Sequence, residues 1–126
     1  MKTLAFLSSL AIVTVTATAA FAATPIKTVK TAKGEVLAGE KGMTLYTFKN
    51  DKSGTSNCYD KCATNWPPLM AASDAKAEGA YSLVTRKDGQ RQWAKDGMPL
   101  YYWVKDTKEG DTTGDGVNGV WDVAKP

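Results

Sequence analysis

Short runs of alternating apolar and polar residues, separated by glycine-containing turns, follow one another along most of the chain. A period of two puts the apolar side chains on one face of an extended strand, and Val, Thr, Tyr and Phe favour strands. The turn at Asp88-Gly89 lies between two such runs and is typical of a β-hairpin. The pattern predicts strands over residues 26–31, 35–38, 43–48, 81–86, 90–94 and 99–104.

The second half of the chain repeats the first at an offset of 55 residues. The segment 42–51 matches 97–106, and the same offset places Gly34 on Gly89 and Trp66 on Trp121. Each copy is expected to be too small to bury its apolar face alone. We therefore predict an all-β protein, in which two pseudo-symmetric three-stranded antiparallel meanders pack as one sandwich or barrel-like domain.

The two strongest predicted strands have different faces. In the first copy, Tyr46 and Phe48 share one face, while Leu45 and Thr47 lie on the other. The matching strand of the second copy carries large side chains on both faces, so we expect it to be central and covered on both sides. Its two faces are Tyr101 with Trp103, and Leu100 with Tyr102 and Val104.

The first 22 residues have the pattern of a cleaved signal peptide. Lys2 precedes an apolar run over residues 4–20, and Ala20-Phe21-Ala22 fits the small-x-small cleavage rule. We predict export to the periplasm or the medium, with no membrane span after cleavage. Residues 23–126 are then a single domain of two repeats, about 24–78 and 79–126.

The charge pattern and the composition exclude several functions. The formal net charge is +3, and lysines alternate with acidic residues, so clustered cations for nucleic acid are missing. The chain has no histidine, which excludes Ser-His-Asp catalysis and histidine-ligated zinc, copper or haem. No cofactor is expected, and the protein is not expected to be an enzyme.

Cys58 and Cys62 are the only cysteines. In an exported protein, a structural disulfide is the favoured interpretation. The alternative is a redox pair or a soft-metal site, because two thiolates can hold Cu(I). A helical turn is expected over residues 58–63, capped by Ser56 or Asn57.

Several short motifs together resemble a bacterial family described as a secreted repeat of unknown function, or as predicted lipoproteins. They include Leu-Tyr-Thr-Phe-Lys-Asn-Asp, Asn-Trp-Pro-Pro-Leu and Gly-Asp-Gly-Val-Asn-Gly-Val-Trp. The resemblance implies an extracytoplasmic protein and no known activity. Lipid attachment is not carried over, because this chain has no cysteine near the cleavage site. The family's Tyr-x-aromatic-x-x-Asp motif occurs twice, as Tyr46, Phe48 and Asp51 and as Tyr101, Trp103 and Asp106.

Acidic residues offer two further candidate sites. Asp51 and Asp106 are expected to cap the turns after their strands. Alternatively, a twofold arrangement of the copies would let these carboxylates share a proton. Asp111, Asp115 and Asn118 lie in a glycine-rich loop whose oxygen atoms suit Ca²⁺, although the spacing is not that of an EF-hand.

Most aromatic residues are expected in the core, and the alternative is an exposed strip that stacks on a ligand. Trp93, Tyr102 and Trp103 are the candidates for such a strip, because Ala38 and Thr47 replace the first two in the other copy. We therefore expect an envelope module that binds a small ligand or another envelope protein. The alternative function is redox or copper handling through the cysteine pair.

Overall fold

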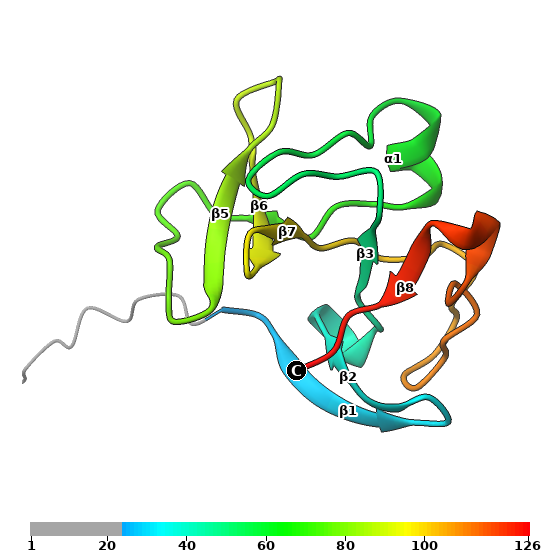
Figure 1. Cartoon of the computed structure of the whole chain (residues 1–126). Helices are drawn as coiled ribbons and strands as arrows, with labels where there is room; N and C mark the ends of the chain where they lie inside the picture. The colour runs from blue at the N-terminus through cyan, green and yellow to red at the C-terminus, as the bar shows by residue number, and fades with distance from the viewer. Residues whose placement is uncertain (1–23) are drawn as a thin grey trace, which may run out of the picture.

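The computed structural model describes residues 24–126, so the predicted signal peptide lies outside the described residues. The chain forms short antiparallel strands with little helix (Figure 1). Residues 24–126 contain one α-helix, α1 (Lys61–Asn65), which lies in the long connection of the first copy, and the 3₁₀ turns are η1 (Glu40–Gly42) and η2 (Val117–Gly119). The strands are β1 (Lys27–Thr31), β2 (Gly34–Ala38), β3 (Tyr46–Phe48), β4 (Met70–Ala71), β5 (Tyr81–Thr85), β6 (Arg91–Lys95), β7 (Met98–Pro99) and β8 (Trp121–Val123).

The strands form three antiparallel sheets, and no closed barrel forms within residues 24–126. The hairpins β1–β2 and β5–β6 were predicted and are present, and β4 and β7 both pair with β6. Of the predicted strand 43–48, only β3 is regular, and of the predicted strand 99–104, only Pro99 belongs to a strand, β7, while Tyr101 forms isolated bridges. A self-contained meander would pair β3 within its own copy, but β3 pairs with β8 of the other copy, so the predicted meander arrangement is not confirmed.

The two copies exchange their last strands. Tyr46 pairs with Tyr101 through two backbone hydrogen bonds of 2.8 and 3.0 Å, at the centre of the molecule. Tyr46 also pairs with Val123, and Tyr101 also pairs with Pro68. Because 68 and 123 are equivalent positions, the end of each copy completes the sheet of the other.

Backbone hydrogen bonds close two matching triangles at this exchange. Leu37 donates to Ala124, Ala124 to Leu45, and Leu45 back to Leu37, at 2.8–2.9 Å. In the other copy, Trp93 donates to Leu69, Leu69 to Leu100, and Leu100 to Trp93, at the same range of distances. Each triangle takes two residues from one copy and one from the other. The equivalent positions Leu45 and Leu100 therefore have equivalent surroundings.

The triangles correct one part of the repeat alignment. Trp93 takes the place of Leu37, whereas a constant offset assigns it to Ala38. One residue more separates Gly89 from Trp93 than separates Gly34 from Leu37, and the following turn is one residue shorter. The extra residue follows the glycine of the β5–β6 turn, and the shorter β6–β7 turn restores the register at Gly97.

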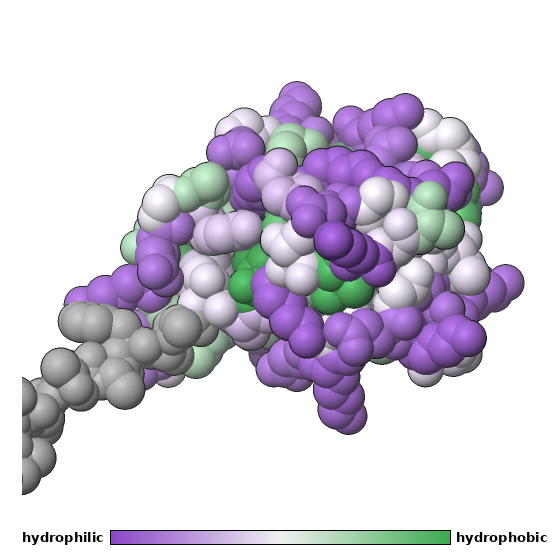
Figure 2. All heavy atoms as spheres, turned by 90° about the horizontal axis from the view of Figure 1, so that it is seen from below, coloured by the Kyte–Doolittle hydropathy of each residue, from purple (hydrophilic) through white to green (hydrophobic). Residues whose placement is uncertain are grey.

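The core has two clusters, which lie on opposite faces of the paired central strands, as the period of two predicts. Val104 is an exception, because it is 49% exposed and not covered as predicted. Figure 2 shows that hydrophilic side chains cover most of one face and leave apolar atoms in narrow gaps. The tyrosine cluster comprises Val36, Tyr46, Cys58, Trp66, Tyr101, Trp121 and Val123. The leucine cluster comprises Leu37, Leu45, Leu69, Ala75, Trp93, Leu100 and Ala124.

Candidate functional site

The two family motifs meet in the core as crossed tyrosine–aspartate pairs. The Tyr46 hydroxyl donates to Asp106 Oδ2 at 2.6 Å, and the Tyr101 hydroxyl donates to Asp51 Oδ2 at 2.6 Å. Both tyrosines are fully buried, and both aspartates are nearly so. Each tyrosine therefore binds the aspartate of the other copy, and the two motifs hold the copies together.

The second oxygen of each carboxylate holds the loop that follows it. Asp51 Oδ1 accepts the Asn57 N–H at 2.6 Å, and Asp106 Oδ1 accepts the N–H and hydroxyl of Thr113 at 3.0 and 2.6 Å. These bonds reach further along the chain than the short turn cap expected. The hydrogen bonds of the described residues join each carboxylate to separate partners, so they form no shared-proton dyad.

Burial sets the protonation of these pairs. It raises the pKa of Tyr46 and of Tyr101 well above the ordinary value, and the bonded carboxylates raise each pKa further. Burial also raises the pKa of Asp51, although hydrogen bonds from Tyr101 and Asn57 and the charge of Arg86 act in the opposite direction. Both tyrosines are therefore neutral hydrogen-bond donors over the physiological pH range.

A buried cation, Arg86, lies beside the Tyr101–Asp51 pair and distinguishes it from the Tyr46–Asp106 pair. The Arg86 guanidinium donates to the Ser56 hydroxyl, the Cys58 carbonyl and Gln92 Oε1 at 2.7–2.9 Å. Ser56 in turn contacts the Tyr101 hydroxyl at 2.6 Å. No sequence motif predicts this network. The signal that would have indicated it is the pair of polar residues, Arg86 and Gln92, on two strands of a hairpin whose first copy has Thr31 and Val36 there.

A stack of four aromatic rings lies beside the crossed pairs, and we call it the aromatic stack. In order, it comprises Phe48, Trp121, Trp66 and Trp103, with ring centroids 4.3, 3.7 and 4.0 Å apart. The edge of the stack faces Tyr46, 5.3 Å from Trp66, and Tyr101, 5.2 Å from Trp121. The order is symmetric, because Phe48 and Trp103, like Trp66 and Trp121, are equivalent positions.

The structure separates the three residues of the expected ligand strip. Trp93 is 2% exposed and belongs to the leucine cluster, which leaves it no surface for stacking. The Tyr102 hydroxyl accepts the Glu40 N–H at 2.9 Å, on the leucine-cluster side. Trp103 ends the aromatic stack and is partly buried, and its Nε1–H is buried without a hydrogen-bond partner.

Cys58 and Cys62 form a disulfide. The Cys58 side chain is fully buried in the tyrosine cluster, and Cys62 packs against that cluster. The helix starts at Lys61, later than predicted, and Asp60 precedes it with φ 54° and no side-chain cap. Neither predicted cap serves, because Ser56 bonds Tyr101 and Arg86 while the Asn57 side chain bonds Asn50.

The candidate calcium ligands are engaged separately. Asp111 Oδ2 accepts hydrogen bonds from the N–H groups of Thr107 and Lys108, and the Thr107 bond lowers the pKa of Asp111. Asp115 Oδ1 accepts the Val123 N–H, and Asn118 occupies a turn at φ 53°. Within residues 24–126, no group of three acidic or cysteine side chains converges as metal ligands would.

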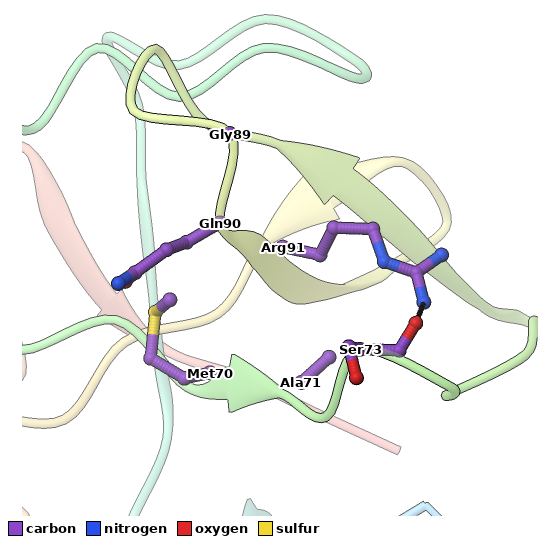
Figure 3. A pocket seen from close by; sticks show the side chains of 6 residues that line it. All are labelled: Met70, Ala71, Ser73, Gly89, Gln90 and Arg91. Atoms are coloured by element: carbon purple, nitrogen blue, oxygen red, sulfur yellow. Dashed lines mark hydrogen bonds between the residues drawn. The ribbon is translucent and has the colours of Figure 1, made fainter.

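An open groove of about 550 Å³ lies between β4 and the β5–β6 turn (Figure 3). One Arg91 nitrogen, Nη2, donates to the carbonyls of Ser73 and Ala75 at 2.7 and 2.8 Å, and to that of Ala72 at 3.4 Å. The side chains of Met70 and Gln90 lie together on the other side. The lining residues are Met70, Ala71, Ser73, Gly89, Gln90 and Arg91.

The chain belongs to the family described as a secreted repeat of unknown function, whose model matches it twice, over residues 27–70 and 82–125. The two matches coincide with the two structural copies. Neither the curated proteins nor the solved structures include a significant match to this chain. Across residues 24–126, no helix has the length and apolarity needed to cross a bilayer.

Proposed function

We propose that this exported protein is a non-enzymatic binding module, whose groove between β4 and the β5–β6 turn takes a small organic anion. A cleaved signal peptide over residues 1–22 would deliver it to the periplasm or the medium, which agrees with membership of a secreted family. The observation that carries the proposal is a cation without a carboxylate partner in a groove whose lining also includes the apolar side chains of Met70 and Ala71.

Arg91 supplies the charge. Its Nη2 is held by backbone carbonyls, so the guanidinium is fixed in place, while its remaining N–H groups have no hydrogen-bond partner among residues 24–126. No carboxylate of the described residues lies within ion-pair distance of it. A planar, positioned guanidinium with free donors suits a carboxylate or a phosphate group.

Met70 and Ala71 supply the apolar wall. Met70 is 38% exposed, and it is one of two large hydrophobic residues that the described part of the chain exposes. The volume of about 550 Å³ is in the range of small-molecule sites. The ligand class is therefore an anion that also carries an apolar group.

Carboxylates with alkyl or aryl groups, titrated against the ¹⁵N-labelled protein, test this proposal, with the matched alcohols as controls. Changes in amide chemical shift should concentrate at the groove residues. Arg91→Gln should weaken binding about tenfold or more, because a hydrogen bond to a charged group is lost. Lys87→Gln, which removes a cation outside the groove, should leave binding unchanged.

Met70→Ser should weaken binding without disturbing the Arg91 carbonyl contacts, which separates ligand contact from loop support. Carboxylates that shift no groove residue, or equal binding by alcohols and by Arg91→Gln, would contradict the proposal. Binding of another envelope protein to the groove, with no binding of small anions, would contradict it too.

Redox or copper handling by Cys58 and Cys62 is less well supported, because both sulfurs are already bonded to each other inside the core. A thiol titration with mild reductant tests that alternative.

A further inference from the structure

We propose that the aromatic stack and the crossed pairs form a relay for oxidising equivalents, which runs from Trp103 at the stack's end to the buried tyrosines. A one-electron oxidant too large to enter the core, such as a high-valent metal complex or an organic radical, would act at Trp103. The electron would finally come from Tyr46 or Tyr101. This inference is independent of the groove.

The rings give a continuous path. Trp103 lies 4.0 Å from Trp66, and Trp66 lies 3.7 Å from Trp121, measured between ring centroids. Tyr46 contacts Trp66 and Tyr101 contacts Trp121 edge-on, at 5.3 and 5.2 Å. Electron tunnelling falls steeply with distance, so several steps between touching rings are faster than one long step.

Proton acceptors give the path its direction. The buried Trp103 Nε1–H has no hydrogen-bond partner, so an oxidised Trp103 has no protein base for its proton. Tyr46 and Tyr101 each donate to a carboxylate at 2.6 Å. An oxidised tyrosine can therefore pass its proton across an existing hydrogen bond to the carboxylate. This leaves a neutral tyrosyl radical beside a neutral carboxylic acid, so no positive charge is left on the aromatic rings.

The steps balance. The oxidant gains one electron from Trp103, which regains it from Trp66, and Trp66 regains it from Tyr46. The Tyr46 O–H bond breaks, and its proton forms an O–H bond on Asp106. The net products are a one-electron-reduced oxidant, a neutral Tyr46 radical and a protonated Asp106. The route through Trp121 to Tyr101 and Asp51 is equivalent.

The two end rings of the aromatic stack differ in how readily they are oxidised. Phe48 occupies the position equivalent to Trp103, and a phenyl ring is much harder to oxidise than an indole. Lys105 Nζ lies 5.8 Å from the centroid of the Trp103 ring. Its positive charge disfavours a cation on that ring and favours movement of the hole inward.

The test uses the variant Tyr59→Phe/Tyr81→Phe/Tyr102→Phe, in which Tyr46 and Tyr101 are the only tyrosines. A photogenerated ruthenium(III) polypyridyl complex oxidises the protein, and electron paramagnetic resonance of the frozen sample identifies the radical. We expect a neutral tyrosyl radical. Adding Trp103→Phe keeps a ring in the stack and should reduce the tyrosyl yield to background.

Asp51→Asn/Asp106→Asn in the same background should leave the radical on tryptophan, because the proton acceptors are gone. Near-ultraviolet circular dichroism verifies that each variant is folded, and Trp103→Phe remains decisive if the aspartate variant is not. A tryptophan radical in the starting variant, or an unchanged tyrosyl yield after Trp103→Phe, would overturn the proposal.

Discussion

Tyr46 and Tyr101 make equivalent hydrogen bonds between the two copies, because each hydroxyl donates to the aspartate of the other copy's motif. The sequence motif predicts that Tyr and Asp belong together, but it contains nothing to say that the partner comes from the other copy. Only the backbone pairing of Tyr46 with Tyr101 decides this. For the same reason, Arg86 could not be placed from its neighbours in the sequence, since Ser56 and Cys58 come from the other copy.

Stability should fall at alkaline pH because of these two tyrosines. Their folded-state pKa lies well above the unfolded value of 10.0, so the unfolded chain loses these protons first as the pH rises. Each tyrosine then lowers the unfolding free energy by about 1.4 kcal/mol per pH unit above pH 10.

Tyr46→Phe/Tyr101→Phe should flatten that alkaline slope by about 2.7 kcal/mol per pH unit, which is the sum for two groups. Urea unfolding at several pH values above 10 measures it at constant ionic strength. Lysine deprotonation acts alike in both proteins and cancels in the difference. Parallel curves for the two proteins would show that these tyrosines ionise freely.

Gly114 is needed because the core lies against it. A Cβ there would come within 2.8 Å of Trp66 and 2.9 Å of Tyr46. Gly114→Ala should therefore destabilise the protein by about 1–3 kcal/mol, as overpacking does. It should also change the near-ultraviolet circular dichroism of the aromatic rings. Gly110→Ala in the same loop is the control, because nothing lies near its Cβ and only backbone strain at φ +89° results. An aromatic spectrum unchanged by Gly114→Ala would contradict this packing.

The elements differ in how far the sequence predicts them. The hairpins β1–β2 and β5–β6 were predicted within two residues at each end, because their pairing is local and glycine turns mark it. The strand segments 43–48 and 99–104 were predicted as longer regular strands. Instead, each segment changes partner between the copies at the two triangles. The helix α1 starts later than expected, because Ser56 is recruited by Tyr101 and Arg86 instead of capping it.

The disulfide closes a short loop that enters the tyrosine cluster. Cys58→Ala/Cys62→Ala should lower the unfolding free energy by about 2 kcal/mol through the added freedom of the unfolded loop. The loss of the buried Cys58 sulfur adds a packing cost. Urea unfolding measures the difference, and the wild-type protein under strong reductant separates the cross-link from the packing. Equal stability of the oxidised and reduced proteins would mean that the bridge constrains nothing.

At the scale of the whole molecule, the repeat predicts two equivalent units, and the structure has them. It does not predict how they join, because exchange of the last strands and simple side-by-side packing leave the same sequence pattern. The candidate site was predicted least well. Arg91 and Met70 lie in the second and first copy respectively, and no motif connects them.

Neither half should fold alone. The fragments 24–78 and 79–126 each lack the strand that closes their own triangle, so each should be unfolded by circular dichroism, and an equimolar mixture should regain native signal. The matched control is a circular permutant, in which a flexible linker joins 126 to 24 and the chain opens at 79. The permutant keeps every contact of the native protein, with the two copies in the opposite order along the chain, and it should fold. A folded single fragment would show that exchange is not required.

The reciprocal exchange also bears on the origin of the chain. A lone ancestral unit with one Tyr-x-aromatic-x-x-Asp motif would have had to close its interior with a second molecule of itself, tyrosine to aspartate in both directions. That ancestor would have been an obligate homodimer with an isologous interface. After fusion, the two halves no longer had to be identical in sequence. Arg86, the disulfide and Trp103 mark positions at which they diverged.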